Sequence, residues 1–324
     1  MSRNSLLAKA LAAAVALAAL LPTTAAYAAP GPSAAVAQAR VPRAVSLVGT
    51  ELRLANDEVV TLPRNLGRWP VLLGTANRGW VVASRGGFWL VLPDGQVEGI
   101  GARDQTNLYV TEGLSDDGRY VVSASSDQGD ALTIRVVNVR GQVVTDARFG
   151  VSKGDLLDAT GGDVYVGGSN GLFLLERGAD KLTQVVRRPT GQVDLDHDTV
   201  FVSSRSHPWR FGPTSLTTPG TPPWRARFTP VAVSPDGRYV VGREGTVRAM
   251  SDGHVVRRVR VQRPRDEFRF AGWASSRRVL LQQVAGRRDL LVSCPVPRGA
   301  CRRVGSTTGL VSLPTSHAGP YQRP

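Results

Sequence analysis

Leu114–Val122 has the sequence Leu-Ser-Asp-Asp-Gly-Arg-Tyr-Val-Val, and Val233–Val241 repeats it as Val-Ser-Pro-Asp-Gly-Arg-Tyr-Val-Val. Both stretches place an Asp-Gly turn, Asp117-Gly118 and Asp236-Gly237, in front of a Tyr-Val-Val run. Aspartate in such a turn accepts hydrogen bonds from nearby backbone N–H groups, and glycine takes the positive φ that follows. Tyrosine and valine favour packed strands. Each stretch therefore predicts a β-hairpin.

Weaker copies of this hairpin extend it into a repeat. They lie at residues 73–82, 158–166, 195–202 and 273–281. The second strands of the six hairpins are predicted to start near residues 80, 120, 164, 200, 239 and 279. A further turn, such as Asp94-Gly95 or Asp252-Gly253, follows most of the hairpins. One repeat of about forty residues is thus four antiparallel strands, which is the blade of a β-propeller.

The two ends of the repeat region determine the number of blades. Residues 44–48, 51–55 and 58–62 supply three strands with no first strand before them, and residues 309–313 are one strand left over. We expect the C-terminal strand to complete the N-terminal blade, which closes the ring and hides the sheet edges. The predicted fold is all-β, a seven-bladed β-propeller. Six or eight blades remain alternatives, because residues 203–224 are too rich in proline to assign.

The SDDGRYVV and SPDGRYVV hairpins resemble the repeats of TolB-like and WD40-like propellers, which are common in exported bacterial proteins. The resemblance covers roughly residues 44–314, and we expect residues 315–324 to form a C-terminal tail. It implies a fold used for binding and scaffolding, with some enzyme relatives. It carries over no catalytic residues, because the matching positions belong to turns and strands.

The N-terminus has the pattern of a secretory signal peptide over residues 1–28. Two basic residues precede an apolar run at residues 10–21, and Ala26-Tyr27-Ala28 supplies small residues where a signal peptidase cleaves. As a helix the run would rise about 18 Å, too little to span a hydrocarbon core about 30 Å thick. We expect a flexible leader over residues 29–43 and a secreted, extracellular protein without a membrane span. Electrostatic association with the cell surface is an alternative.

Two cysteines, Cys294 and Cys301, flank a turn-rich segment near the C-terminus. Export places them under oxidising conditions, so we expect a disulfide that closes this hairpin. A metal site would need further ligands close in sequence, and none occur beside them. We expect no metal and no other cofactor.

Basic charge is concentrated in the second half of the chain. Residues 181–324 contain 24 basic and nine acidic residues. The densest stretch is residues 254–265, where we single out Arg258, Arg260, Arg263 and Arg265 as a candidate anion-binding set. The opposing interpretation is compositional, because arginine outnumbers lysine 37 to 3 over the whole chain.

Two further groups of residues invite a functional interpretation. Asp194, Asp196 and Asp198 alternate around His197 and could form a calcium cage, but the segment aligns with the other hairpin turns and we favour a turn. Aromatic residues at positions 209, 211 and 224 lie among prolines, where we favour a structural role over a contact surface.

These features favour a monomeric, secreted binding or interaction module without catalytic activity. Its partner is an unidentified protein or an anionic cell-wall polymer, and nucleic acid is not expected because no binding motif occurs. The alternative is an extracellular propeller hydrolase or lyase acting on sugars, lactones or peptides. Convergence of aspartate or histidine side chains from several blades would favour that alternative.

Overall fold

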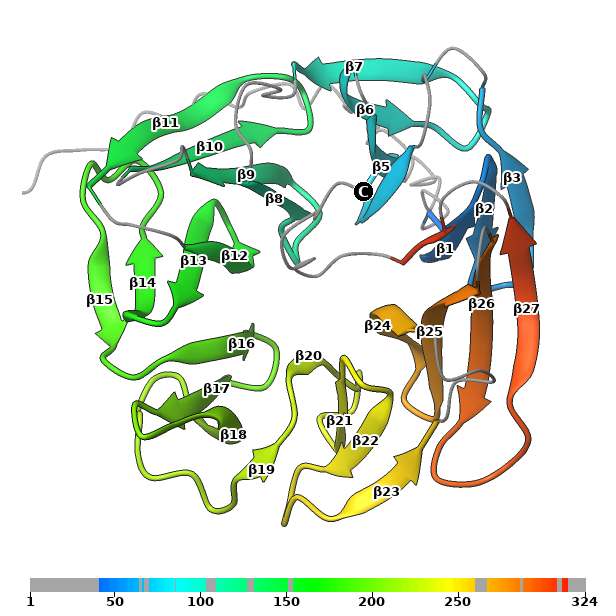
Figure 1. Ribbon diagram of the computed structural model, residues 1–324. Coiled ribbons are helices and arrows are strands. Elements are labelled where there is room, and N and C mark those ends of the chain that lie inside the picture. Colours follow the sequence, from blue (N-terminus) through cyan, green and yellow to red (C-terminus); the bar gives the residue numbers. More distant parts are fainter. Residues whose placement is uncertain are drawn as a thin grey trace, which may run out of the picture. The chain divides into compact units, whose positions relative to one another are not determined.

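A computed structural model describes residues 41–63, 66, 70–84, 86–102, 109–126, 131–150, 154–259, 267–285, 288–307 and 311–313. The predicted signal peptide, the predicted leader up to residue 40 and the predicted C-terminal tail lie outside these residues. In the described part of the chain, 28 strands form seven four-stranded antiparallel sheets. The sheets are arranged as blades in a ring, which confirms the seven-bladed β-propeller (Figure 1).

The blades follow one another along the chain, and the strands of each blade are ordered from its inner to its outer edge. Blade 1 comprises β28 (Val311–Ser312), β1 (Ala44–Val48), β2 (Glu51–Leu54) and β3 (Val59–Thr61). Blade 2 comprises β4 (Val71–Ala76), β5 (Gly79–Ser84), β6 (Gly87–Val91) and β7 (Val97–Gly101). Blade 3 comprises β8 (Tyr109–Leu114), β9 (Tyr120–Ser126), β10 (Leu132–Asn138) and β11 (Val143–Phe149).

Blades 4 to 7 continue the same order. They comprise β12 (Asp155–Thr160), β13 (Asp163–Gly168), β14 (Gly171–Leu175) and β15 (Thr183–Val186); β16 (Thr190–Asp194), β17 (Thr199–Ser204), β18 (His207–Ser215) and β19 (Ala226–Arg227); β20 (Pro230–Val233), β21 (Tyr239–Gly242), β22 (Thr246–Ala249) and β23 (Val255–Arg258); and β24 (Glu267–Ser275), β25 (Arg278–Ala285), β26 (Arg288–Pro295) and β27 (Arg302–Thr307). The second strand of each blade from 2 to 7 begins within one residue of the position predicted from the repeat.

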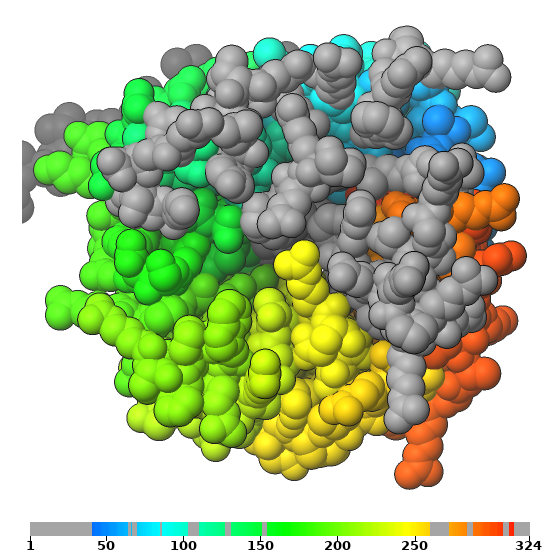
Figure 2. All heavy atoms as spheres, viewed as in Figure 1, coloured from blue at the N-terminus to red at the C-terminus, as the bar shows by residue number. Residues whose placement is uncertain are grey.

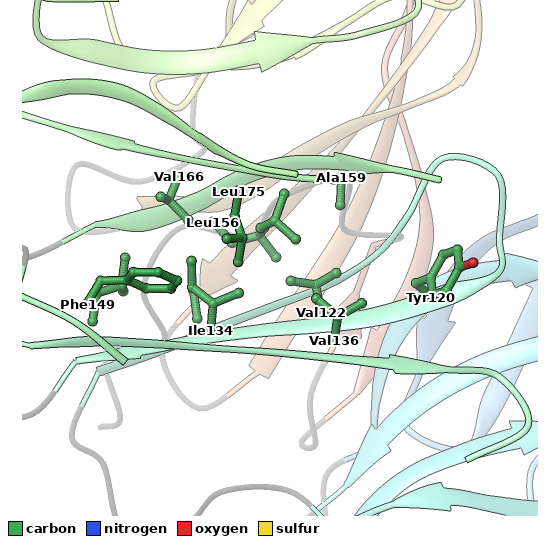
Figure 3. Close-up of a cluster of buried hydrophobic side chains, with 12 residues drawn as sticks. Tyr120, Val122, Ile134, Val136, Phe149, Leu156, Ala159, Val166 and Leu175 are labelled. Atoms are coloured by element: carbon green, nitrogen blue, oxygen red, sulfur yellow. The ribbon is translucent and has the colours of Figure 1, made fainter. Parts of the chain in front are cut away.

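The core consists of apolar layers between neighbouring blades. Each of the seven clusters of buried hydrophobic side chains in the described residues lies at one junction between blades. Successive residues of a strand point to opposite faces of its sheet. In β9, accordingly, Tyr120 and Val122 pack toward blade 4 (Figure 3). Val121 between them packs toward blade 2. Burial on both faces explains why the predicted strands are continuous apolar runs.

The C-terminal strand closes the ring as the sequence predicts. Val311 and Ser312 of β28 pair with Val48 and Leu47 of β1, which makes β28 the inner strand of blade 1. The backbone N–H of Leu72 in blade 2 donates a hydrogen bond of 3.1 Å to the Ser312 hydroxyl. Blade 1 is therefore built from both ends of the repeat region.

The chain is already anchored just before β1, within the last residues of the predicted leader. The indole N–H of Trp80 donates to the carbonyl oxygen of Pro42 at 2.9 Å, and the Arg43 guanidinium donates to the carbonyl oxygen of Trp273 at 2.9 Å. These two contacts tie residues 42 and 43 to blades 2 and 7.

The proline-rich segment at residues 203–224 belongs to blade 5. It contains the nine-residue strand β18 and the connection to the two-residue strand β19. Trp224 packs with Phe201 and Phe228 between blades 5 and 6, at centroid distances of 6.5 and 5.9 Å. Trp209 is 71% exposed and has no such role. The side chains of blades 5 and 6 fill the space between their ribbons, as the light green and yellow atoms show (Figure 2).

Candidate anion-binding groove

A groove lies between the outer strand of blade 6 and the face of blade 7. Strands β22 and β23 have four residues each, whereas β26 has eight. The short outer strands of blade 6 cover only part of the facing sheet, and a groove of about 540 Å³ remains. Among the described residues, its lining includes Arg257, Arg258, Val259, Gln283, Leu290, Val292, Cys301, Arg302 and Arg303.

The floor of the groove is mainly apolar, with the buried polar side chain of Gln283 beside Leu290. Leu290 and Val292 point to the same face of β26 and are half-buried, while Leu291 between them is buried toward blade 1. Val259, just after β23, is 7% exposed and packs in the cluster between blades 6 and 7. The floor is thus an incompletely covered part of the interblade core.

Arginines form the rim of this groove. Arg258 is exposed at the end of β23, and Arg302 and Arg303 are exposed at the start of β27. No ion pair within the described part of the chain involves any of these three side chains. Their guanidinium groups can therefore offer paired N–H donors and positive charge to a carboxylate or phosphate group.

Arg257 is held differently from the other three arginines. Its guanidinium donates to the carbonyl oxygens of Pro295 and Gly299, each at 2.8 Å, and contacts the Cys301 sulfur at 3.0 Å. All three acceptors belong to the tip of the β26–β27 hairpin. Arg257 therefore links blade 6 to blade 7 across the groove and fixes a positive charge in its wall.

The predicted disulfide between Cys294 and Cys301 is present and closes that same hairpin tip. Cys294 is fully buried in the cluster between blades 6 and 7, whereas Cys301 is exposed and lines the groove. The disulfide thus connects the core to the groove wall and holds the acceptors of Arg257 close together.

The structure places one residue of the predicted anion-binding set, Arg258, in the groove. Arg260, Arg263 and Arg265 lie outside the described residues. Arg302 and Arg303 were noticeable in the sequence as a basic pair just after Cys301, but their position beside Arg258 depends on how blade 7 packs against blade 6. No sequence signal marks Leu290 and Val292 as a floor, because both look like ordinary strand residues.

The predicted turn residues occupy the inner hairpin turns of blades 3 and 6. Gly118 has φ 66° and Gly237 has φ 69°, and the carboxylates of Asp117 and Asp236 accept N–H bonds two residues on, at 3.1 and 3.3 Å. The hydroxyl groups of the preceding serines, Ser115 and Ser234, donate to the same carboxylates. Their role is to shape the hairpins.

A group of carboxylates converges from three blades near the inner strands. Asp116 follows β8, Asp158 lies on β12, and Asp194 ends β16 and contacts the His197 ring nitrogen at 3.0 Å. The carboxyl groups of Asp116 and Asp158 share a hydrogen bond. Asp116 is partly exposed. Desolvation of its carboxyl group by the surrounding protein, then the charges of Asp158 and Asp196, raise the pKa of Asp116 to about 8. Burial likewise raises the pKa of Asp194 above its ordinary value.

These carboxylates are also committed to backbone contacts between blades. Asp158 accepts N–H bonds from Ala159 at 2.7 Å and from Leu195 of blade 5 at 3.2 Å. Asp196 and Asp198 lie in the turn after β16, as the favoured interpretation predicts, and Asp198 accepts hydrogen bonds from Ser215 and Thr217. No group of three or more potential metal ligands suited to an ion is found among the described residues.

Comparisons with known proteins identify no family. No protein-family model matches the sequence, and no curated protein matches it. Within the described residues, no helix has both the length and the apolar character needed to cross a bilayer.

Several solved structures match the chain at low identity. Hsv2 of Kluyveromyces marxianus is 13% identical, with 81% of this chain and 92% of that chain covered and a TM-score of 0.48. TolB from Acinetobacter baumannii is 14% identical, with 86% and 65% covered and a TM-score of 0.43. PorZ of Porphyromonas gingivalis, a bacterial surface component of the type-IX secretion system, is 14% identical, with 78% and 39% covered and a TM-score of 0.44.

Proposed function

We propose that this protein is an interaction module that binds an anionic partner in the groove between blades 6 and 7. One observation carries the proposal: three exposed arginines without an acidic partner in the described residues surround an apolar floor. Unpaired charges of one sign in a concave site attract ligands of the opposite sign and raise their association rate.

We further propose that the protein acts outside the cytoplasm. The secretory pattern of residues 1–28 supports this proposal, and so does the disulfide, because disulfides persist in oxidising compartments. An anionic surface polymer or an acidic segment of another exported protein would then be within reach of the groove.

Binding of a fluorescent oligoglutamate, followed by anisotropy at low and moderate salt, tests the groove. The variant Arg258→Gln/Arg303→Gln removes two rim charges. The matched control Arg210→Gln/Arg227→Gln removes two exposed charges that are paired in register on blade 5. We expect the groove variant to weaken binding at least tenfold and the control less than twofold. Equal losses in the two variants would show attraction to net charge alone and would contradict the proposal.

A second candidate function, hydrolysis or lyase chemistry on sugars, lactones or peptides, is favoured by one observation. Aspartates from blades 3, 4 and 5 converge with His197, and Asp116 has a raised pKa suited to a general acid. We rank it second because Asp158 is engaged by backbone N–H groups on both of its oxygens.

The variant Asp116→Asn distinguishes the two candidates. If the aspartate group is catalytic, a turnover found by screening glycosides, lactones and peptides must fall by at least a hundredfold in this variant, while oligoglutamate binding is retained. A turnover that survives the substitution would contradict a catalytic role for this group.

A further inference from the structure

The composition of the groove restricts the kind of anion that fits it. Charged rims occur on many surfaces, but in this groove the arginines surround Leu290 and Val292, which are only half-buried. Exposed aliphatic groups in a concave site gain free energy when a ligand covers them. A ligand that uses the whole groove must therefore supply both anionic and apolar groups.

We propose that the occupant is an acidic polypeptide segment that also carries aliphatic side chains. This inference rests on the proposed function of the same groove. Alternating acidic and aliphatic residues in an extended segment place carboxylates toward one side and apolar side chains toward the other. The carboxylates reach Arg258, Arg302 and Arg303, while the aliphatic side chains cover Leu290 and Val292.

An anionic polymer of polyol phosphates fits this groove less well. Its phosphates satisfy the arginines through the same paired N–H donors. Its remaining polar groups are hydroxyls, which either leave the floor uncovered or lose hydrogen bonds with water when they lie against it. The volume of about 540 Å³ lies within the range of ligand sites that bury most of a bound molecule, so the floor contributes to recognition.

Three probes of equal charge separate these chemistries. Two labelled, end-capped eight-residue peptides carry four glutamates that alternate with leucine in one and with serine in the other. The third probe is a glycerol phosphate oligomer with four phosphodiester groups and no terminal phosphate monoester. Binding of each to the intact mature protein is measured by anisotropy, and the variant Val292→Thr makes the floor polar without changing its charge and with little change in its shape.

We expect the glutamate–leucine peptide to bind about tenfold more tightly than either other probe. Val292→Thr should weaken that peptide about threefold and leave the glutamate–serine peptide unchanged. If the glycerol phosphate oligomer or the glutamate–serine peptide binds as tightly as the glutamate–leucine peptide, this inference is overturned and the anion-binding proposal stands. If none of the three probes binds, the proposed function itself fails.

Discussion

The guanidinium group of Arg257 in blade 6 donates a hydrogen bond of 2.8 Å to the carbonyl oxygen of Pro295 in blade 7. Together with the bond to Gly299, this contact joins the outer part of one blade to the disulfide-closed hairpin of the next. Elsewhere the junction between blades 6 and 7 consists of an apolar cluster and a hydrogen bond of 3.1 Å from the Trp273 indole N–H to the carbonyl oxygen of Ala232. Arg257 thus adds a polar link at the place where the short outer strands of blade 6 leave the groove open.

Replacing this arginine should weaken the junction between the two blades. Arg257→Lys keeps the charge but loses the planar group that reaches two carbonyl oxygens, and we expect the free energy of unfolding to fall by about 1–2 kcal/mol. The matched control, Arg258→Lys, changes an exposed neighbour and should cost less than about 0.5 kcal/mol. Denaturant unfolding measures both values, and equal losses would show that the Arg257 link does not stabilise the fold.

The disulfide should support both stability and binding. In Cys294→Ala/Cys301→Ala, the loss of a cross-link around so short a loop lowers the free energy of unfolding by about 2–3 kcal/mol. Because the acceptors of Arg257 lie on this loop, affinity for the acidic probe should also fall several-fold. The same loss of affinity is expected when the unmodified protein is treated with a dithiol, which reduces the disulfide. The double variant has no disulfide, so its affinity should not change on this treatment. An unchanged affinity after reduction would show that binding in the groove does not depend on the disulfide-closed hairpin tip.

The inner hairpin turns should not tolerate a side chain at their glycines. A Cβ atom on Gly237 would lie 2.6 Å from Cδ2 of His197, whose ring is held by Asp194, and the residue has φ 69°. Gly178 has a similar φ of 75° with open space around it, which makes it a matched control.

We expect Gly178→Ala to cost about 1–2 kcal/mol for the left-handed conformation alone, and Gly237→Ala to cost at least about 1 kcal/mol more. Thermal or denaturant unfolding gives both numbers. Similar values for the two variants would mean that the turn of blade 6 does not pack tightly on the turn of blade 5.

The raised pKa of Asp116 should make the free energy of unfolding depend on pH. The pKa of Asp116 is about 8 in the folded protein and about 3.8 without its surroundings. Between these values the folded chain retains a proton that the unfolded chain releases, so the free energy of unfolding falls as pH rises from about 4 to about 8.

Release of one proton changes the free energy of unfolding by at most about 1.4 kcal/mol per pH unit. Because Asp116 is partly exposed to solvent, the change is smaller than this limit. Asp116→Asn removes the titrating group, so the variant should gain stability relative to the unmodified protein as pH rises from about 5 to about 8. Denaturant unfolding at each pH measures this difference. A difference that stays constant over this range would contradict the shared proton.

Much of the fold follows from local sequence, because turn chemistry and strand periodicity are local properties. The Asp-Gly turns locate the hairpins, and the leftover strand at the C-terminus pairs with β1 as expected. Blade 5 is the exception: prolines interrupt the pattern there, and its outer strand has only two residues, Ala226 and Arg227. Such a strand is positioned by packing of Trp224 between the blades rather than by its own sequence.

The candidate groove could be predicted only in part. The basic stretch around Arg258 and the disulfide are visible in the sequence, because both are contiguous features. The floor and the apposition of Arg258 with Arg303 depend on the difference in length between neighbouring blades, which is a tertiary property. The link from Arg257 to Pro295 joins residues 38 positions apart and carries no local signal.

The central claim, that an anionic ligand occupies the groove between blades 6 and 7, is tested most directly by mapping the contact. The glutamate–leucine peptide, with a photoreactive group at its centre, is cross-linked to the protein, and the attachment sites are identified by mass spectrometry of proteolytic fragments. The account predicts attachment at residues 288–295 and 302–306, suppressed by Arg258→Gln/Arg303→Gln. Attachment confined to blades 1 to 5, or spread evenly over all exposed arginines, would contradict it.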